Sequence, residues 1–272
     1  MSASRLEIIS FENLTLEVQG RAYLRDADLA IYEGESLIVA GLPGCGKSFI
    51  LRAILGLPGD NLEDVRLEGD LTIDGQSVLE MSHEELQQLR RRMGTVMGSV
   101  MNPGGLIDNM DVSGNIALPL NYHNRGIMSL EEIEGRCEVL LRDMDMVELG
   151  IPGLRPVALN REQRLYVSLA RCLVNDPIAL LMDDPASGLS PGNAHRLKGF
   201  LFDYQPEFAT YPSHEARSER ALTRVVTTSD LSQYLDVGDR FAVISDGKVR
   251  VVGDHEDVAA STDEEVLELL SP

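Results

Sequence analysis

Short apolar segments separated by turn residues dominate the first third of the chain and return near its end. In the first third, this pattern predicts strands at Leu6–Ile9, Leu14–Val18, Ala27–Ile31, Ser36–Ala40 and Leu71–Ile73. In the second half, it predicts strands at Ile178–Met182 and Val225–Thr227, and a hairpin of Arg240–Ser245 and Lys248–Val252. The run 178–182 is apolar at every position, which fits a central strand of a parallel sheet covered on both faces.

Helix-start signals lie between these strands. A Ser or Thr followed three residues later by Glu predicts helices that begin near Ser82, Ser129 and Thr262, over about 82–92, 129–147 and 262–270. Signals between 103 and 165 are mostly helical. We therefore expect one α/β domain over 1–272 with a mixed sheet and a helical subdomain, 103–165, inserted in its core. Asp203–Arg220 is expected to be a surface loop.

Composition narrows the class of protein without indicating its chemistry. The 272 residues include 24 Lys and Arg against 44 Asp and Glu, which gives a net charge of −20. This charge argues against binding nucleic acid, or an anionic lipid surface, through a broad basic face. No apolar run approaches the roughly 18 residues of a membrane span, and the first residues have no signal-peptide pattern. With three cysteines that lack metal-ligand spacing, the expected location is the cytoplasm.

The clearest chemical motif is a phosphate loop. Residues 41–48, Gly-Leu-Pro-Gly-Cys-Gly-Lys-Ser, follow an expected strand and open a helix that starts at Phe49. Glycines in such a loop let backbone N–H groups turn inward on phosphates, and the helix N-terminus adds positive potential. Lys47 is expected to pair with the β and γ oxygens, and Ser48 to bind Mg²⁺. The predicted nucleotide-binding residues are Gly41, Leu42, Pro43, Gly44, Cys45, Gly46, Lys47, Ser48 and Phe49.

A second part of the site follows from the apolar run 178–182. Phosphate-loop proteins use an acid at the end of a strand as a ligand for Mg²⁺, and Asp183 has this position. The alternative is an Asp that caps a helix or forms a turn. The phosphate loop favours the Mg²⁺ role.

The residues after Asp183 carry a family resemblance. Asp183–Pro191, Asp-Asp-Pro-Ala-Ser-Gly-Leu-Ser-Pro, resembles the Walker B motif and D-loop of ABC ATPases, and Gly69–Gly75 and Asp239–Gly247 resemble the early hairpin and closing strands of that family. The resemblance implies a P-loop NTPase core with N-terminal antiparallel strands, and ATP and Mg²⁺ as cofactors. It also implies head-to-tail dimerisation, with itself or a related ATPase, on an integral membrane permease at the inner face of the membrane. Asn115–Leu120 and the tail Asp263–Leu270 look most like the Mce/Mla-type lipid-transport ATPases.

Several positions depart from the family pattern. Asp184 stands where the family has the Glu that positions the attacking water, and Ser229 stands at the switch histidine. The signature segment, which normally contacts the partner's ATP, consists here of Asn160, Arg161, Glu162 and Gln163. Its alternative role, in which Asn160 and Gln163 cap the following helix, is favoured.

The remaining departures concern the adenine and the metal. Val18 lies where the family stacks an aromatic ring on adenine. The Q-loop glutamine is displaced, and its equivalent is Gly98 or, by preference, Asn102, which would add a third Mg²⁺ ligand.

Two hypotheses result. In the first, the chain is the ATP-binding subunit of a transporter, with lipid as the candidate cargo, and retains ATP–Mg²⁺ binding with slow or absent hydrolysis. In the second, it is a non-hydrolysing scaffold whose association with a partner is controlled by nucleotide.

Overall fold

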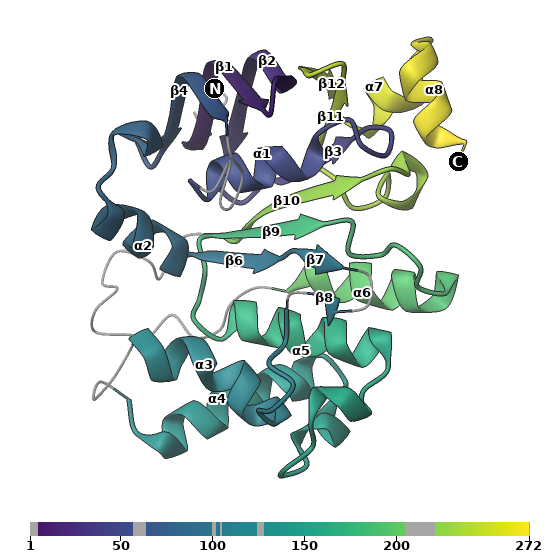
Figure 1. Cartoon of the computed structure of the whole chain (residues 1–272). Helices are drawn as coiled ribbons and strands as arrows, with labels where there is room; N and C mark the ends of the chain where they lie inside the picture. The colour runs from purple at the N-terminus through teal and green to yellow at the C-terminus, as the bar shows by residue number, and fades with distance from the viewer. Residues whose placement is uncertain are drawn as a thin grey trace. The chain divides into compact units, whose positions relative to one another are not determined.

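A computed structural model describes residues 5–56, 64–99, 102–103, 105–123, 128–204 and 221–271. The chain forms two compact units (Figure 1). The first unit comprises Met1–Arg90, Met182–Asp184 and Arg220–Pro272. The second comprises Arg91–Leu181 and Pro185–Glu219.

The first unit begins with an antiparallel sheet in the order β2-β1-β4-β5. Its strands are β1 (Glu7–Val18), β2 (Arg21–Tyr32), β4 (Val65–Ile73) and β5 (Gln76–Ser77). The prediction of two separate strands over 6–9 and 14–18 is wrong, because β1 is continuous. A bulge keeps it in the sheet: Asn13 adopts a φ of 47°, and its N–H donates to Asp28 Oδ1 at 2.8 Å. The expected turn between β4 and β5 is confirmed, with positive φ at Asp74 and Gly75.

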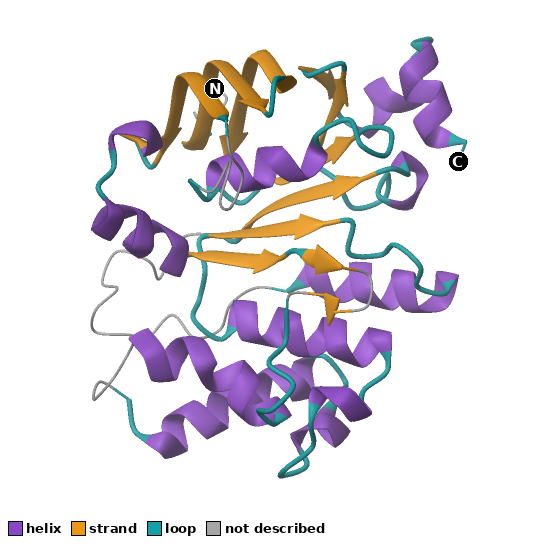
Figure 2. Cartoon of the chain, viewed as in Figure 1, coloured by secondary structure: helices purple, strands orange, loops and turns teal. Residues whose placement is uncertain are grey.

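A second group of strands in the first unit is ordered β12-β11-β3-β10 (orange in Figure 2). Their bounds are β3 (Ser36–Ala40), β10 (Thr223–Thr228), β11 (Arg240–Ser245) and β12 (Lys248–Gly253). The central β3 pairs in parallel with β10 and β11, and all five of its residues are buried. The predicted hairpin of β11 and β12 is confirmed as antiparallel, with positive φ at Asp246 and Gly247 in its turn.

The helices of the first unit are short. They are α1 (Lys47–Ile54), η1 (Val78–Glu80), α2 (His83–Arg91, whose last residue belongs to the second unit), η5 (Leu231–Gln233), α7 (His255–Ala259) and α8 (Glu264–Leu270). The predicted Ser82 cap is confirmed, since its hydroxyl accepts from the Glu85 amide at 3.3 Å. The predicted Thr262 cap is wrong. Asp263 caps α8 instead, because its carboxylate accepts from the amides of Glu265 and Val266.

The second unit is mostly helical. Its strands and helices are β6 (Met93–Val96), β7 (Gly98–Ser99), β8 (Asn102–Pro103), α3 (Val112–His123), α4 (Leu130–Asp143), η2 (Val147–Gly150), η3 (Pro156–Ala158), α5 (Arg161–Leu173), the first part of β9 (Ala179–Asp183) and α6 (Pro191–Asp203). Helices α3, α4 and α5 pack on one another, and α5 also packs on β6 (Figure 1).

The second unit contains a predicted helix cap, and the helix that follows it is shorter than expected. The Ser129 capping box is confirmed, but the helix expected over 129–147 ends at Asp143. Asp145 adopts a left-handed φ of 55°, which a continuing α-helix does not allow. Of the expected surface loop 203–220, Asp203 ends α6, and residues 205–220 lie outside the described residues. No helix in the described ranges is long and apolar enough to cross a membrane.

Candidate functional site

The phosphate loop connects the end of β3 to the start of α1 in the first unit. Gly44 and Gly46 adopt positive φ of 80° and 115°, which turns the backbone in a way that L side chains rarely adopt. A Cβ on Gly46 would lie 3.0 Å from the carbonyl oxygen of Tyr23, so a side chain at this position would also be tightly crowded. The glycine spacing of the motif therefore has a geometric cause here.

Lys47 folds back over this loop. Its Nζ donates to the carbonyl oxygens of Gly41 at 2.5 Å and Leu42 at 3.1 Å. A lysine ammonium has three donors on a flexible stem, so it can exchange carbonyl partners for phosphate oxygens without moving the backbone. The arrangement is suited to binding an anion at the start of α1.

Ser48 and Asp183 lie side by side in the same unit. The hydroxyl of Ser48 donates to Asp183 Oδ2 at 2.6 Å, and Thr227 Oγ1 donates to Asp183 Oδ1 at 2.6 Å. These contacts fix both oxygens of a carboxylate at the carboxyl end of β9, beside the first turn of α1. Hydroxyl and carboxylate oxygens are ligands that Mg²⁺ prefers, so the donor set fits this ion.

The remaining ligands of such a cation would come from elsewhere. Within the part of the chain that the structure describes, no group of three or more His, Cys, Asp or Glu side chains could hold a metal ion. Mg²⁺ usually binds through one or two protein ligands together with phosphate oxygens and waters. The pair of Ser48 and Asp183 matches this usual number of protein ligands.

Asp184 and Ser229 are close to this pair. The N–H of Asp184 donates to the carbonyl oxygen of Thr227 at 2.9 Å. Thr227 lies near the end of β10, two residues before Ser229, so this bond holds Asp184 close to Ser229. Asp184 has a φ of 46°, and both residues are partly exposed. The structure thus brings the two predicted catalytic residues to the same edge as Ser48 and Asp183.

The signature segment, Asn160–Gln163, lies in the second unit at the start of α5. The predicted capping box is confirmed: Asn160 Oδ1 accepts from the Gln163 amide at 2.9 Å, and Gln163 Oε1 accepts from the Asn160 amide at 3.0 Å. Its other two side chains also bind within this unit. The guanidinium of Arg161 fills the space that a Cβ on Gly188 would need, and Asn193 Nδ2 donates to Glu162 Oε2 at 2.6 Å.

The two candidates for the Q-loop lie on one short ribbon. Strands β7 and β8 pair Gly98 with Pro103 and Ser99 with Asn102. The side chain of Asn102 lies outside the described residues, so its role as a Mg²⁺ ligand stays a prediction.

Sequence reasoning missed two groups beside the phosphate loop. Thr227 anchors Asp183, and its place in the run of two threonines that ends β10 was the available signal. Arg21 donates from Nη2 to the carbonyl oxygen of Gly44 at 2.9 Å, and no motif in the sequence indicates this contact. Val18, expected near adenine, is only 4% exposed.

The parallel strands, the glycine loop opening α1 and the Ser48–Asp183 pair define an α/β protein of the phosphate-loop nucleotide-binding class. Residues 24–187 match the family model described as ABC transporter, which spans more than half of the chain. The chain therefore belongs to the ABC transporter family, and the predicted fold class is confirmed. Domains of this family bind ATP with Mg²⁺, which confirms the predicted cofactors.

Three similar proteins illustrate the family. The methionine import ATP-binding protein MetN of Bordetella avium is 30% identical over 246 residues, which cover 89% of this chain and 60% of MetN. This chain thus spans less than two thirds of that relative. The phosphonates import ATP-binding protein PhnC 3 of Halalkalibacterium halodurans is 26% identical, over 95% of this chain and 93% of its own length. The ATP-binding cassette MJ0796, in a dimeric post-hydrolysis state with ADP and Pi, is 27% identical with a TM-score of 0.72, over 90% of this chain and 98% of its own.

Proposed function

We propose that this chain is the ATP-binding subunit of a membrane ABC transporter, and that ATP-dependent dimerisation of such subunits drives or gates transport. The Ser48–Asp183 pair beside a lysine-bearing glycine loop carries this proposal. A structure of that kind can bind a triphosphate and its Mg²⁺ together, which is what an ATP-driven switch requires.

The residues have separate roles in nucleotide binding. Backbone N–H groups of residues 44–49 surround the phosphates at the N-terminus of α1, and Lys47 leaves its loop carbonyls to neutralise the β and γ oxygens. Ser48 and Asp183 would hold Mg²⁺, and Asn102, the preferred Q-loop equivalent, would be a third ligand. Mg²⁺, when bound, neutralises phosphate charge. Thr227 keeps the Asp183 carboxylate in place.

We further propose that hydrolysis is weak. Asp184 is one methylene shorter than the family's Glu, and reach matters because general-base help contributes on the order of 10²–10⁴ in rate. Ser229 can donate to a γ-phosphate but cannot carry the charge of an imidazolium. The side chains of the signature segment already bind their own chain, which leaves less for a partner's ATP.

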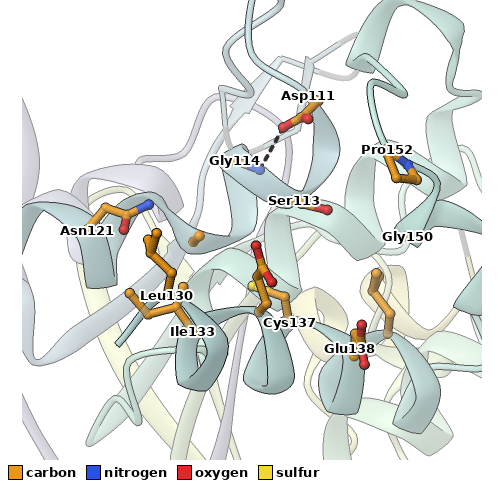
Figure 3. A pocket seen from close by; sticks show the side chains of 13 residues that line it. Asp111, Ser113, Gly114, Asn121, Leu130, Ile133, Cys137, Glu138, Gly150 and Pro152 are labelled. Carbon is orange, nitrogen blue, oxygen red and sulfur yellow. Dashed lines mark hydrogen bonds between the residues drawn. The ribbon is translucent and has the colours of Figure 1, made fainter. Parts of the chain in front are cut away.

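The permease partner would dock on the second unit. A cavity of about 460 Å³ lies between α3 and α4, and Asp111 is one of the residues that line it (Figure 3). The family resemblance implies that the groove beside Asn102–Val112, which includes Asp111, receives the coupling helix of a permease. Gly114 of α3 and Ile133 of α4 supply small and apolar surface, while Glu134 and Glu138 supply negative charge. Burial raises the pKa of the Cys137 thiol in this wall to about 12, so it stays neutral. We propose that a short permease helix with an apolar face and a basic end occupies this cavity.

The proposed docking of a permease helix can be tested at an exposed residue of the cavity. Leu130 lines the cavity and is 74% exposed, so Leu130→Glu should leave the fold intact while placing charge against the apolar face of the partner. Val157→Glu is the matched control, since Val157 is 73% exposed and does not line the cavity. The first variant should lose a co-purifying membrane protein and the second should keep it; equal recovery with both would reject this docking site.

The alternative is a nucleotide-gated scaffold that never hydrolyses ATP. The full chain, purified from membranes with any bound partners, distinguishes the two by phosphate release and co-purification. If an integral membrane protein co-purifies and ATP stimulates dimerisation of the chain, the result supports a transporter subunit at the inner face of the membrane. Dimerisation without membrane protein or phosphate release supports the scaffold. Lipid stays a candidate cargo on the resemblance of Asn115–Leu120 and the tail alone, since the relatives' names give methionine and phosphonates.

A further inference from the structure

Two stacked aromatic rings with an arginine at each end lie beside the phosphate loop. The rings of Tyr23 and Phe49 stack with centroids 4.0 Å apart and an interplanar angle of 29°. The guanidinium carbon of Arg21 lies 4.9 Å from the Tyr23 centroid, and that of Arg52 lies 5.6 Å from the Phe49 centroid. All four residues belong to the first unit.

The stack meets the loop at three points. Phe49 directly follows Ser48 on the first turn of α1, and the Tyr23 side chain lies 3.3 Å from where a Cβ on Gly46 would be. Arg21 is hydrogen-bonded to the carbonyl of Gly44. A nucleotide whose phosphates bind the amides of this loop would have its sugar and base within reach of the stack.

Open space adjoins the Arg21 end of the stack. Arg21, Leu42 and Cys45 line a cavity of about 280 Å³, and Arg21 itself is exposed. Val18 faces Arg21 in the β1–β2 ladder but is buried, so its side chain offers no surface to a ligand. Of these two paired residues, only Arg21 can therefore contact a base.

We propose that the guanidinium of Arg21, supported by the Tyr23–Phe49 pair, is the surface on which the base of the bound nucleotide stacks. This inference rests on the proposed nucleotide binding. The guanidinium is planar, weakly hydrated and held by a ring beneath it, which are the properties that let arginine stack on flat π systems. Its hydrogen bond to the carbonyl oxygen of Gly44 holds the guanidinium group in position relative to the phosphate loop.

Calorimetry with two ligands tests this role, with the full chain and Mg²⁺ in each case. ATP has a base, whereas inorganic tripolyphosphate offers only phosphates. Because stacking of the base adds affinity that the phosphates do not supply, Arg21→Ala should weaken ATP binding by about tenfold and change tripolyphosphate binding by less than about twofold. Arg21→Lys keeps the charge but lacks the plane, so it should resemble Arg21→Ala. Arg66→Ala, which replaces an exposed arginine on strand β4 of the same sheet, should change neither affinity.

The ring beneath Arg21 supplies a second test. Tyr23→Phe keeps the ring and should bind ATP like the unmodified chain, while Tyr23→Leu should lose part of the base-dependent affinity. An equal loss of ATP and tripolyphosphate affinity in Arg21→Ala would make Arg21 a phosphate ligand and overturn the inference. So would unchanged ATP affinity in both Arg21 variants. If the unmodified chain binds neither ligand, the proposed nucleotide binding fails first.

Discussion

The phosphate loop and the signature segment are both short turns that open a helix, yet their polar groups are used in opposite ways. Around the loop, Lys47 binds two carbonyls and Ser48 binds Asp183, contacts that a triphosphate and a cation can replace. In the signature segment, Asn160 and Gln163 cap their own helix and Glu162 binds Asn193. The polar groups of the phosphate loop can exchange their present partners for a ligand, whereas those of the signature segment stabilise the fold.

The largest effect is expected at Lys47. Lys47→Ala removes the ammonium that neutralises the β and γ oxygens, so calorimetry should show ATP–Mg²⁺ affinity reduced by about a hundredfold. Lys248→Ala, on exposed β12, is the control that keeps the loop intact. ATP binding that survives Lys47→Ala unchanged would show that this turn does not hold a nucleotide, and the contrast between the two turns would then have no functional meaning.

A pair of glycine variants examines the geometry of the loop. Both Gly44 and Gly46 have positive φ, but only Gly46 lies against Tyr23, while nothing lies within 4 Å of a Cβ on Gly44. Gly46→Ala should lower the free energy of unfolding by about 2–3 kcal/mol, and Gly44→Ala by about 1 kcal/mol, because a left-handed Ala costs roughly 1–2 kcal/mol without any clash. Urea denaturation measures both. Equal losses would mean that contact with Tyr23 does not constrain the loop.

Some features of the fold and the site could be predicted from the sequence, and others could not. The loop, the cap at Asn160 and the strand ending at Asp183 follow from local patterns, since each depends on residues a few positions apart. The contacts of Arg21 with Gly44 and of Thr227 with Asp183 join residues 23 and 44 positions apart, and no local period encodes them. The continuity of β1 was missed because a bulge at Asn13 interrupts the alternation from which strands are predicted.

A gain of function would sharpen the contrast from the catalytic side. Asp184→Glu restores the length of the carboxylate side chain, and Ser229→His restores an imidazole at the end of β10. Together they should raise phosphate release by about tenfold, provided that the signature segment of the partner subunit is adequate. The Lys47→Ala variant of the same double mutant must lose that gain, which excludes a contaminating ATPase. No gain at all would place the limit on hydrolysis at the signature segment instead.

The smallest effect concerns the signature segment itself. Asn160→Ala removes a side-chain cap and should lower the free energy of unfolding by about 1 kcal/mol, as loss of such a cap usually does. If the segment serves stability alone, ATP affinity and phosphate release should stay within about twofold of the unmodified chain at a temperature where both are folded. Ser129→Ala, which removes the equivalent cap of α4, is the matched control and should have the same thermal effect. A fall in turnover with Asn160→Ala but not with Ser129→Ala would show that Asn160 still takes part in ATP hydrolysis, and that the segment combines a cap with a nucleotide contact.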